Sequence, residues 1–470
     1  MPLAALLAVF LFAHLAGWQA GAESLKPGTG PEAQNMALLG ENDLQGRSAY
    51  QPSIHRQGDR WIAYIGHHGG KARNPLTGQD EDNGTSIVDV TDPAHPNYLH
   101  HIPGQPGSGE GGGAQMTRVC EGRTLPHGDP SKTYLLRGFG QIAEEVWDVT
   151  DPAKPSLVTR LEGFSDTHKN WWECDTGIAY LVVGVPGWRT RRMTRVVDLS
   201  DPAHPILIRD FGLSGQQPGV TGPVPPELHG PISLGAGANR IYFAYGPGGE
   251  GVLQILDRRK LLEGPKEPTD ANLLYPQVGR LDLSPLYGAH TSFPLPGMPI
   301  PEFAPDAEGA VRDIVMVVGE EMKDRCAAPQ QMVLFVDVTV ESKPMVISNY
   351  NLPQQSGAFC QRGGRFGSHA SNESFSPVFY KKLAFISYFN AGVRALDIHD
   401  PYNPREVGFF IPEVTRNTCQ KAAADAPCRA VIQTNNVEND ERGFIYIVDR
   451  AGNGLHILRL TGEAAKVAAK

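Results

Sequence analysis

The chain has 470 residues, including 53 glycines and 39 prolines, and a formal net charge of −9. This length suggests more than one domain, unless internal repeats build a single large unit. The acidic balance gives no indication of a nucleic-acid partner, and the many glycines and prolines are typical of turn-rich all-β proteins.

The chain opens with an apolar segment. Residues 2–17 are almost wholly apolar, and Ala20-Gly21-Ala22 has the small-x-small form of a signal-peptidase site. This pattern predicts a signal peptide over residues 1–22. The apolar stretch is shorter than the roughly 20 apolar residues that a membrane-spanning helix needs, and no second apolar stretch follows. We therefore expect a periplasmic or secreted protein without a membrane span.

A motif resembling Asp-Val-Thr-Asp-Pro, preceded by apolar residues, recurs along the chain. It is clearest at Asp89–Pro93, Asp148–Pro152 and Asp198–Pro202, and looser copies follow. The first Asp, or the residue in its place, stands at positions 89, 148, 198, 257, 337, 397 and 459. The copies are 50 to 80 residues apart. Seven copies with this spacing predict a β-propeller.

Each repeat contains the same expected elements. An apolar, β-branched and aromatic run predicts a strand, and the stretch with the Asp predicts the next strand. Asp-Pro then predicts a turn, because proline cannot continue a ladder, and a further strand follows. The first runs are residues 61–65, 133–136, 178–183, 240–245, 314–318, 383–388 and 444–448. We predict an all-β, seven-bladed β-propeller, whose radial repetition leaves few exposed edges, as suits a monomer.

Ring closure can also be predicted. Asn35–Gly40 precedes the first repeat and looks like the outer strand that follows each Asp-Pro turn. The last repeat lacks this strand, because Leu460 runs into a polar tail at residues 461–470. We expect the N-terminal segment to complete the seventh blade of a single propeller over residues 23–460. The alternative is a disordered N-terminal extension.

The repeat signature resembles that of a known family. Ile87-Val88-Asp89-Val90-Thr91-Asp92-Pro93 is similar to the motif of the LVIVD-repeat family, bacterial and archaeal proteins of the cell envelope assigned to β-propellers. The resemblance covers roughly residues 50–460. It implies the fold and carries no settled chemistry, because propellers host many unrelated functions.

Six cysteines fit an oxidising compartment, in which disulfides persist. The best local pair is Cys419 with Cys428, which lie nine residues apart. The other candidates are Cys326 with Cys360, which flank the Asp strand of one repeat, and Cys120 with Cys174, which fall in adjacent repeats. The sequence alone leaves the connectivity open. The absence of Cys-x-x-Cys argues against thiol-redox and zinc-ribbon sites.

A histidine stands ahead of the apolar strand in several repeats. The first strand of each propeller blade lines the axial channel, so equivalent positions in different blades meet near the axis. The five histidines are His168, His229, His290, His369 and, as the weakest member, His55. Imidazole suits zinc, copper and iron, so the pattern predicts a transition-metal site holding one of these ions. His67 and His68, after the first apolar strand, are expected in a loop.

Seven further residues are candidates for the surroundings of this site. Metal-bound histidines usually have an outer carboxylate or carbonyl partner, which favours nearby glutamates. Two adjacent tryptophans can wall a pocket, and two arginines in a glycine-rich stretch can bind a carboxylate or phosphate. The candidates are Glu173, Glu227, Glu373, Trp171, Trp172, Arg362 and Arg365.

These patterns leave the function open between two classes. A histidine-bound metal supports oxidative or Lewis-acid chemistry on a small molecule, as in a metal-dependent oxidoreductase. The alternative is a non-catalytic propeller whose loops bind an envelope protein or glycan and whose histidines bond neighbouring blades. A metal-free ligand site is a third interpretation. No Gly-x-Ser-x-Gly motif of hydrolases, Walker motif or His-Glu-x-x-His is present. The direction of the histidine side chains distinguishes the first two classes.

Overall fold

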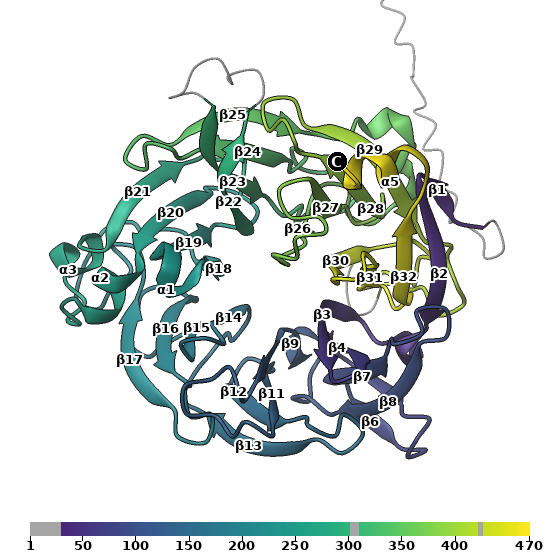
Figure 1. Cartoon of the computed structure of the whole chain (residues 1–470), viewed down its shortest axis with the longest axis horizontal. Coiled ribbons are helices and arrows are strands. Elements are labelled where there is room, and N and C mark those ends of the chain that lie inside the picture. The colour runs from purple at the N-terminus through teal and green to yellow at the C-terminus, as the bar shows by residue number, and fades with distance from the viewer. Residues whose placement is uncertain (1–29, 301–309, 422–425) are drawn as a thin grey trace, which may run out of the picture.

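The computed structural model describes residues 30–300, 310–421 and 426–470. Within these ranges, seven antiparallel sheets stand around a central axis (Figure 1). The all-β, seven-bladed propeller predicted from the repeats is therefore confirmed. The segment expected to be a signal peptide lies outside the described residues.

The first four blades follow one another along the chain, each as a meander of four strands. Blade 1 consists of β3 (Ala49–Gln57), β4 (Arg60–Gly69), β7 (Thr85–Asp89) and β8 (Asn97–Ile102), with β9 (Gly109–Ala114) beside β4 and the ladder of β5 (Lys71–Arg73) and β6 (Asp80–Asp82) in a loop. Blade 2 consists of β10 (Thr117–Glu121), β11 (Thr133–Phe139), β12 (Ala143–Asp148) and β13 (Ser156–Leu161). Blade 3 consists of β14 (Asn170–Trp172), β15 (Ile178–Val183), β16 (Met193–Asp198) and β17 (Ile206–Phe211). Blade 4 consists of β18 (Leu228–Ser233), β19 (Arg240–Tyr245), β20 (Val252–Asp257) and β21 (Gln277–Asp282).

The last three blades repeat this plan. Blade 5 consists of β22 (Thr291–Pro299), β23 (Val311–Val318), β24 (Val333–Asp337) and β25 (Met345–Tyr350). Blade 6 consists of β26 (Ala370–Ser371), β27 (Leu383–Ser387), β28 (Val393–Asp397) and β29 (Arg405–Ile411). Blade 7 consists of β30 (Thr434–Asn439), β31 (Ile445–Asp449) and β32 (Gly454–Leu460), completed by a strand from the other end of the chain. The short helices are α1 (Gly235–Ala238), α2 (Arg258–Glu263), α3 (Asp270–Leu274), α4 (Phe359–Arg362) and α5 (Gly462–Ala468).

The repeated Asp marks the end of the third strand in blades 1 to 6, from β7 to β28. Asp89 accepts a hydrogen bond from the backbone N–H of Thr91 at 2.9 Å, and Asp92 accepts one from Ala94 at 3.0 Å. Asp148 and Thr150 repeat the first of these contacts at 3.0 Å. The motif recurs because each blade needs the same side-chain-bonded turn between its third and fourth strands.

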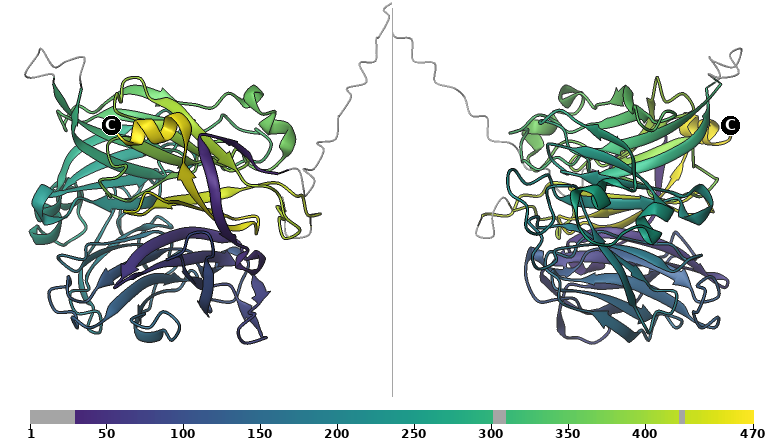
Figure 2. Two further views of the ribbon diagram at one scale, coloured as in Figure 1. Left: turned by 45° about the vertical axis from the view of Figure 1, so that its right-hand side comes forward. Right: turned by 90° about the vertical axis from the view of Figure 1, so that its left-hand side faces the viewer.

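The N-terminal segment closes the ring, as predicted. β2 (Met36–Asn42) pairs with β32, with Met36 opposite Leu460, and so supplies the outer strand of blade 7 (Figure 2). β1 (Glu32–Gln34) adds a fifth strand to blade 6 by pairing with β29. The C-terminal segment expected to be a polar tail forms α5, which buries Ala464 and Val467.

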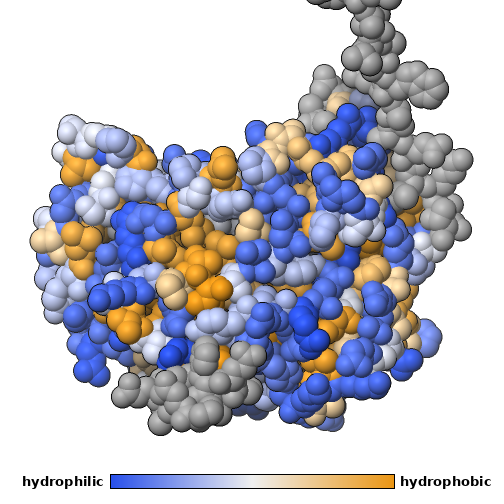
Figure 3. All heavy atoms as spheres, turned by 90° about the horizontal axis from the view of Figure 1, so that it is seen from above, coloured by the Kyte–Doolittle hydropathy of each residue, from blue (hydrophilic) through white to orange (hydrophobic). Residues whose placement is uncertain are grey.

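All three expected disulfides are present. Cys120–Cys174 links blades 2 and 3, Cys326–Cys360 connects segments 34 residues apart, and Cys419–Cys428 closes a local loop of blade 7. No helix in the described ranges is both long and apolar enough to cross a membrane. The part of the rim seen in Figure 3 is mostly hydrophilic, with scattered apolar areas.

The disulfide between blades should matter more than the local one. Replacing both Cys120 and Cys174 with serine is expected to lower the free energy of unfolding by about 2–4 kcal/mol, because the bond constrains a long segment of the unfolded chain. Urea unfolding monitored by fluorescence measures the change. Serines at Cys419 and Cys428, which close a loop with a sequence separation of only 9, are the matched control and should have a smaller effect. Equal losses would contradict this account.

Candidate metal centre

Four of the five predicted histidines converge at one end of the axial channel. His168, His290 and His369 stand just before β14, β22 and β26, and His229 is the second residue of β18. The ring centres of His168 and His229 are 4.6 Å apart, those of His229 and His290 are 3.8 Å apart, and those of His290 and His369 are 4.4 Å apart. All four side chains are buried. Blades 3 to 6 therefore contribute one imidazole each.

Outer hydrogen bonds fix the orientation of two of these rings. His229 donates from Nδ1 to the carbonyl oxygen of His290 at 3.2 Å, and His369 donates from Nδ1 to the carbonyl of Asn435 at 2.5 Å. A carbonyl only accepts, so both protons sit on Nδ1 and both Nε2 atoms carry a lone pair. This is the arrangement by which proteins orient metal-binding imidazoles.

The Nε2 atoms face one another with few other partners. His168 Nε2 lies 2.8 Å from His229 Nε2 and 3.3 Å from the hydroxyl of Tyr50. Two nitrogen ligands on one tetrahedral zinc ion, each about 2.0–2.1 Å from it, are roughly 3.3–3.4 Å apart, so His168 and His229 would have to separate by about 0.5 Å to share one. His290 Nε2 is buried without a hydrogen-bond partner among the described residues. A buried nitrogen of this kind fits a metal ligand.

Burial also sets the charge of these rings. It lowers the pKa of His168, His229, His290 and His369 well below the usual histidine value, because a buried imidazolium loses its hydration. Neighbouring histidines and the Lys169 ammonium lower the pKa of His229 and His290 further. The four imidazoles are therefore neutral at neutral pH, which is the form that binds metal ions.

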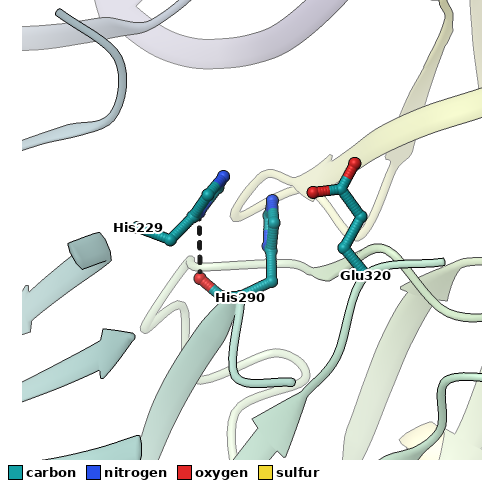
Figure 4. Close-up of side chains that lie close together, drawn as sticks. All are labelled: His229, His290 and Glu320. Atoms are coloured by element: carbon teal, nitrogen blue, oxygen red, sulfur yellow. Dashed lines mark hydrogen bonds between the residues drawn. The ribbon is translucent and has the colours of Figure 1, made fainter. Parts of the chain in front are cut away.

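A carboxylate completes the cluster. Ligand atoms of His229, His290 and Glu320 lie within 4.8 Å of one another, and Figure 4 shows the two imidazoles side by side with the Glu320 carboxylate next to His290. Glu320 Oε1 also lies 3.7 Å from His369 Nε2. Burial raises the pKa of Glu320, whereas Arg365 and Arg450 oppose this shift. Two histidines and a carboxylate form a ligand set typical of non-haem iron, and imidazoles also suit copper and zinc.

A cavity of about 190 Å³ opens beside the cluster. His168, His229 and His369 line it together with Tyr50 and Glu320. A ligand in the cavity can therefore reach the histidine edges directly.

The repeat seen in the sequence matches a known family model. The model of the LVIVD repeat matches residues 79–101 and 195–211, which include the Asp-Pro turns of blades 1 and 3. The chain therefore contains LVIVD repeats.

Solved structures are similar to this protein at low sequence identity. Raptor of Chaetomium thermophilum is similar with a TM-score of 0.52 and 9% identity, over 92% of this chain and 29% of that chain. A chain of a mitotic checkpoint complex has a TM-score of 0.46 and 9% identity, over 98% of this chain and 100% of that chain. The likeness to Raptor concerns the fold alone. No curated protein sequence matches this chain significantly.

The fifth predicted histidine lies elsewhere. His55 is near the end of β3, bonds Glu121 at 2.7 Å and lines a separate cavity with Arg118 and Glu373. Tyr50, the second residue of β3, holds the place equivalent to the other histidines and contacts His168. Five residues of a strand span about 17 Å, so His55 stands well below the cluster. The expectation of five aligned histidines was wrong in blade 1.

The three predicted glutamates have partners other than the histidines. Glu173 pairs with Arg258 at 2.6 Å, and Glu227 pairs with Arg191, with both residues lining the cavity. Glu373 pairs with Arg118 and Lys169 further along the channel. The outer partners of the histidines are instead backbone carbonyls and, for His290, the hydroxyl of Thr291 at 2.9 Å.

The predicted tryptophans and arginines divide between the site and the scaffold. Trp171 packs against Phe375, and Trp172 is buried and donates to the carbonyl of Gly177 at 3.3 Å. Neither lines the cavity beside the histidines. Arg362 pairs with Glu32 of β1, whereas Arg365 lines the cavity and donates to Glu320 at 2.8 Å.

Several site residues were missed by the sequence interpretation. Glu320, Arg192 and Arg450 lie in or beside the connections between second and third strands. His68 belongs to β4, not to a loop as expected, and lies 3.4 Å from Glu110, which lines the cavity. These connections leave the blade at the end where the first strands begin, so the topology brings them to the histidines.

Proposed function

We propose that this LVIVD-repeat propeller is an exported protein that binds one copper, iron or zinc ion through its axial histidines. The ligands are drawn from His168, His229, His290 and His369, with Glu320 as a further oxygen ligand. The protein then acts on a small molecule in the neighbouring cavity. The periplasm or the cell exterior suits three disulfides, which persist in oxidising compartments.

One observation carries this proposal. Neutral, buried imidazoles present Nε2 atoms to one another, and the Nδ1 atoms of His229 and His369 are held by backbone carbonyls. Most buried side-chain polar atoms in proteins have a hydrogen-bond partner. His290 Nε2 has no such partner among the described residues. The set therefore favours a shared cation over hydrogen bonding alone.

The residues around the histidines determine the chemistry. A bound transition metal with an open coordination position would supply Lewis-acid or oxidative chemistry. The cavity gives a small molecule access to that position, and Tyr50 places a hydroxyl 3.3 Å from His168. Burial raises the pKa of Tyr50 well above its usual value, so the phenol keeps its proton and can donate a hydrogen bond to a ligand.

A non-catalytic interaction propeller is the second candidate function. His229 and His369 each bond the backbone of the next blade, and such contacts by themselves serve a structural role. In this alternative the loops bind an envelope protein or glycan, and the histidines hold the blades together. Loss of a histidine would then reduce stability without changing metal content.

Elemental analysis tests the two alternatives. We expect about one copper, iron or zinc ion per chain after expression in an oxidising compartment, or after reconstitution with each ion. His229→Ala and His290→Ala should each abolish most of this binding, because a water molecule in the place of a lost imidazole binds the ion more weakly. His204→Ala is the matched control, since the His204 side chain is exposed and bonds Asp201.

The outcomes separate the candidates. A wild-type protein that holds no ion after reconstitution with each metal would contradict the proposal. Metal content that is unchanged in folded His229→Ala and His290→Ala proteins would place the ion elsewhere. Circular dichroism verifies that each variant is folded before the metal is measured.

A further inference from the structure

The cavity beside the histidines has an unusual number of arginines. Arg191, Arg192, Arg365 and Arg450 line it together with Glu110, Glu227 and Glu320. Four guanidinium groups against three carboxylates leave one formal positive charge while the histidines are neutral. A bound divalent metal would add to this charge. The cavity therefore favours a negatively charged ligand.

Two of the arginines are already paired. Arg191 contacts both carboxylate oxygens of Glu227, at 2.8 and 2.5 Å. Arg365 donates to Glu320 at 2.8 Å. Glu227 and Glu320 are therefore paired, and the guanidinium groups of Arg191 and Arg365 have little charge left to attract a ligand.

Arg192 and Arg450 are different, because their terminal nitrogens lack close acceptors in the described chain. Arg192 donates from Nε to the carbonyl of Asp166 at 3.1 Å, but its Nη1 is 4.0 Å from Glu227. Arg450 Nη2 approaches Glu110 only to 3.6 Å. The Arg192 and Arg450 side chains are 5% and 15% exposed, so neither guanidinium is well hydrated by bulk water. Buried guanidinium groups normally have acceptors.

We propose that the cavity binds a small oxyanion, a carboxylate or a phosphate, whose charged group is held by Arg192 and Arg450 beside the histidines. This inference rests on the proposed metal centre for the identity of the substrate, but the arginine charges are present without the metal. The fork of a guanidinium matches two oxygens of either group. The cavity of about 190 Å³ limits the ligand to a small molecule.

Titration calorimetry with oxalate, succinate and inorganic phosphate at low salt tests this inference. Both metal-free and metal-loaded proteins are titrated, and metal content is measured separately. We expect saturable binding of at least one anion, and tighter binding when the metal is present. Arg192→Gln and Arg450→Gln should each weaken it about tenfold or more, because hydrogen bonds between charged groups are strong.

Arg195→Gln is the matched control from the same segment of chain. Arg195 contacts Asp210 at 2.7 Å and does not line the cavity, so its loss should leave anion affinity unchanged. Arg192→Lys and Arg450→Lys keep the charge and should retain part of the affinity, which separates a lost contact from a misfolded cavity.

Each outcome bears on this inference separately from the metal. Preference for the carboxylates or for phosphate identifies the source of the oxyanion. A protein that binds metal but none of the three anions overturns the inference and leaves the metal centre standing. An anion affinity that is unchanged from the wild type in both glutamine variants does the same. Anion binding to a protein that takes up no metal retains the inference and removes the proposed function.

Discussion

Deleting residues 23–42 should lower the free energy of unfolding by several kcal/mol. The deletion removes β2, whose residues Met36–Asn42 pair with β32 and form the outer edge of blade 7. Met36 is 4% exposed and packs in the core shared by blades 6 and 7. Loss of this strand opens the ring and exposes the edge of β32. The unpaired backbone groups of that edge can then pair with other chains. The loss is large beside the roughly 5–15 kcal/mol that stabilises a typical domain.

A shorter deletion is the matched control. Removing residues 23–31 leaves both β1 and β2 in place, so its melting temperature should match that of the full chain. Removing residues 23–34 also deletes β1, an addition to the edge of blade 6, and should have an intermediate effect. Scanning calorimetry and light scattering measure melting and aggregation. A deletion of residues 23–42 that melts and remains dispersed like the control would show that the ring closes without β2.

The fold was predictable because its signal is repeated. The Asp that ends β7, β12 and β16 makes the same backbone contacts in each blade, so its spacing reveals the number of blades. Closure by β2 was predictable because one blade lacked its outer strand. The cysteine pairs were candidates only, since the sequence leaves connectivity open.

The candidate site was predictable only in part. Histidines at the starts of four first strands were found, because equivalent positions in a propeller meet at the axis. In blade 1, the sequence favours His55, whereas Tyr50 holds the equivalent place in the structure. The error arose because β3 is long and begins well before the apolar run. Short strands such as β14 leave less room for this ambiguity.

Site residues that lie outside the repeated sequence motif could not be found from one sequence. Glu320 and Arg450 lie beside connections that differ in length and composition among the blades. Nothing in their local sequence indicates that they approach the same point. Their contact with the histidine cluster depends on how seven sheets close, which is a property of the whole ring. The glutamates near the histidines in sequence were also misleading, because strand direction carries Glu173 and Glu373 away from the cluster.

Replacing Glu144 with glutamine should stabilise the protein at neutral and alkaline pH. Glu144, in β12, is fully buried, and its hydrogen bond comes from the side chain of Asn170 at 3.1 Å. Burial raises the pKa of this carboxyl to about 8 from a usual value of 4.5, whereas Asn170 opposes the shift. A carboxylate in this place is costly because it lacks a cation partner among the described residues.

The sign of the pH effect follows from proton binding. Below about pH 4.5 both the folded and the unfolded protein hold the Glu144 proton, so the group does not change stability with pH. Between about pH 4.5 and 8 the unfolded chain releases the proton while the folded protein keeps it. The folded state then binds more protons, and the free energy of unfolding falls by up to about 1.4 kcal/mol per pH unit.

Glutamine keeps the acceptor for Asn170 and has no proton to lose. Glu144→Gln and the wild type should therefore be similar in stability near pH 4.5, and the variant should be more stable by about 3–5 kcal/mol near pH 8. Urea unfolding at both pH values measures the difference. Glu162→Gln, at an exposed carboxyl of the same region, is the control and should give no such trend. A Glu144→Gln variant with the same stability offset at both pH values would show that the buried carboxyl does not hold its proton in the folded protein.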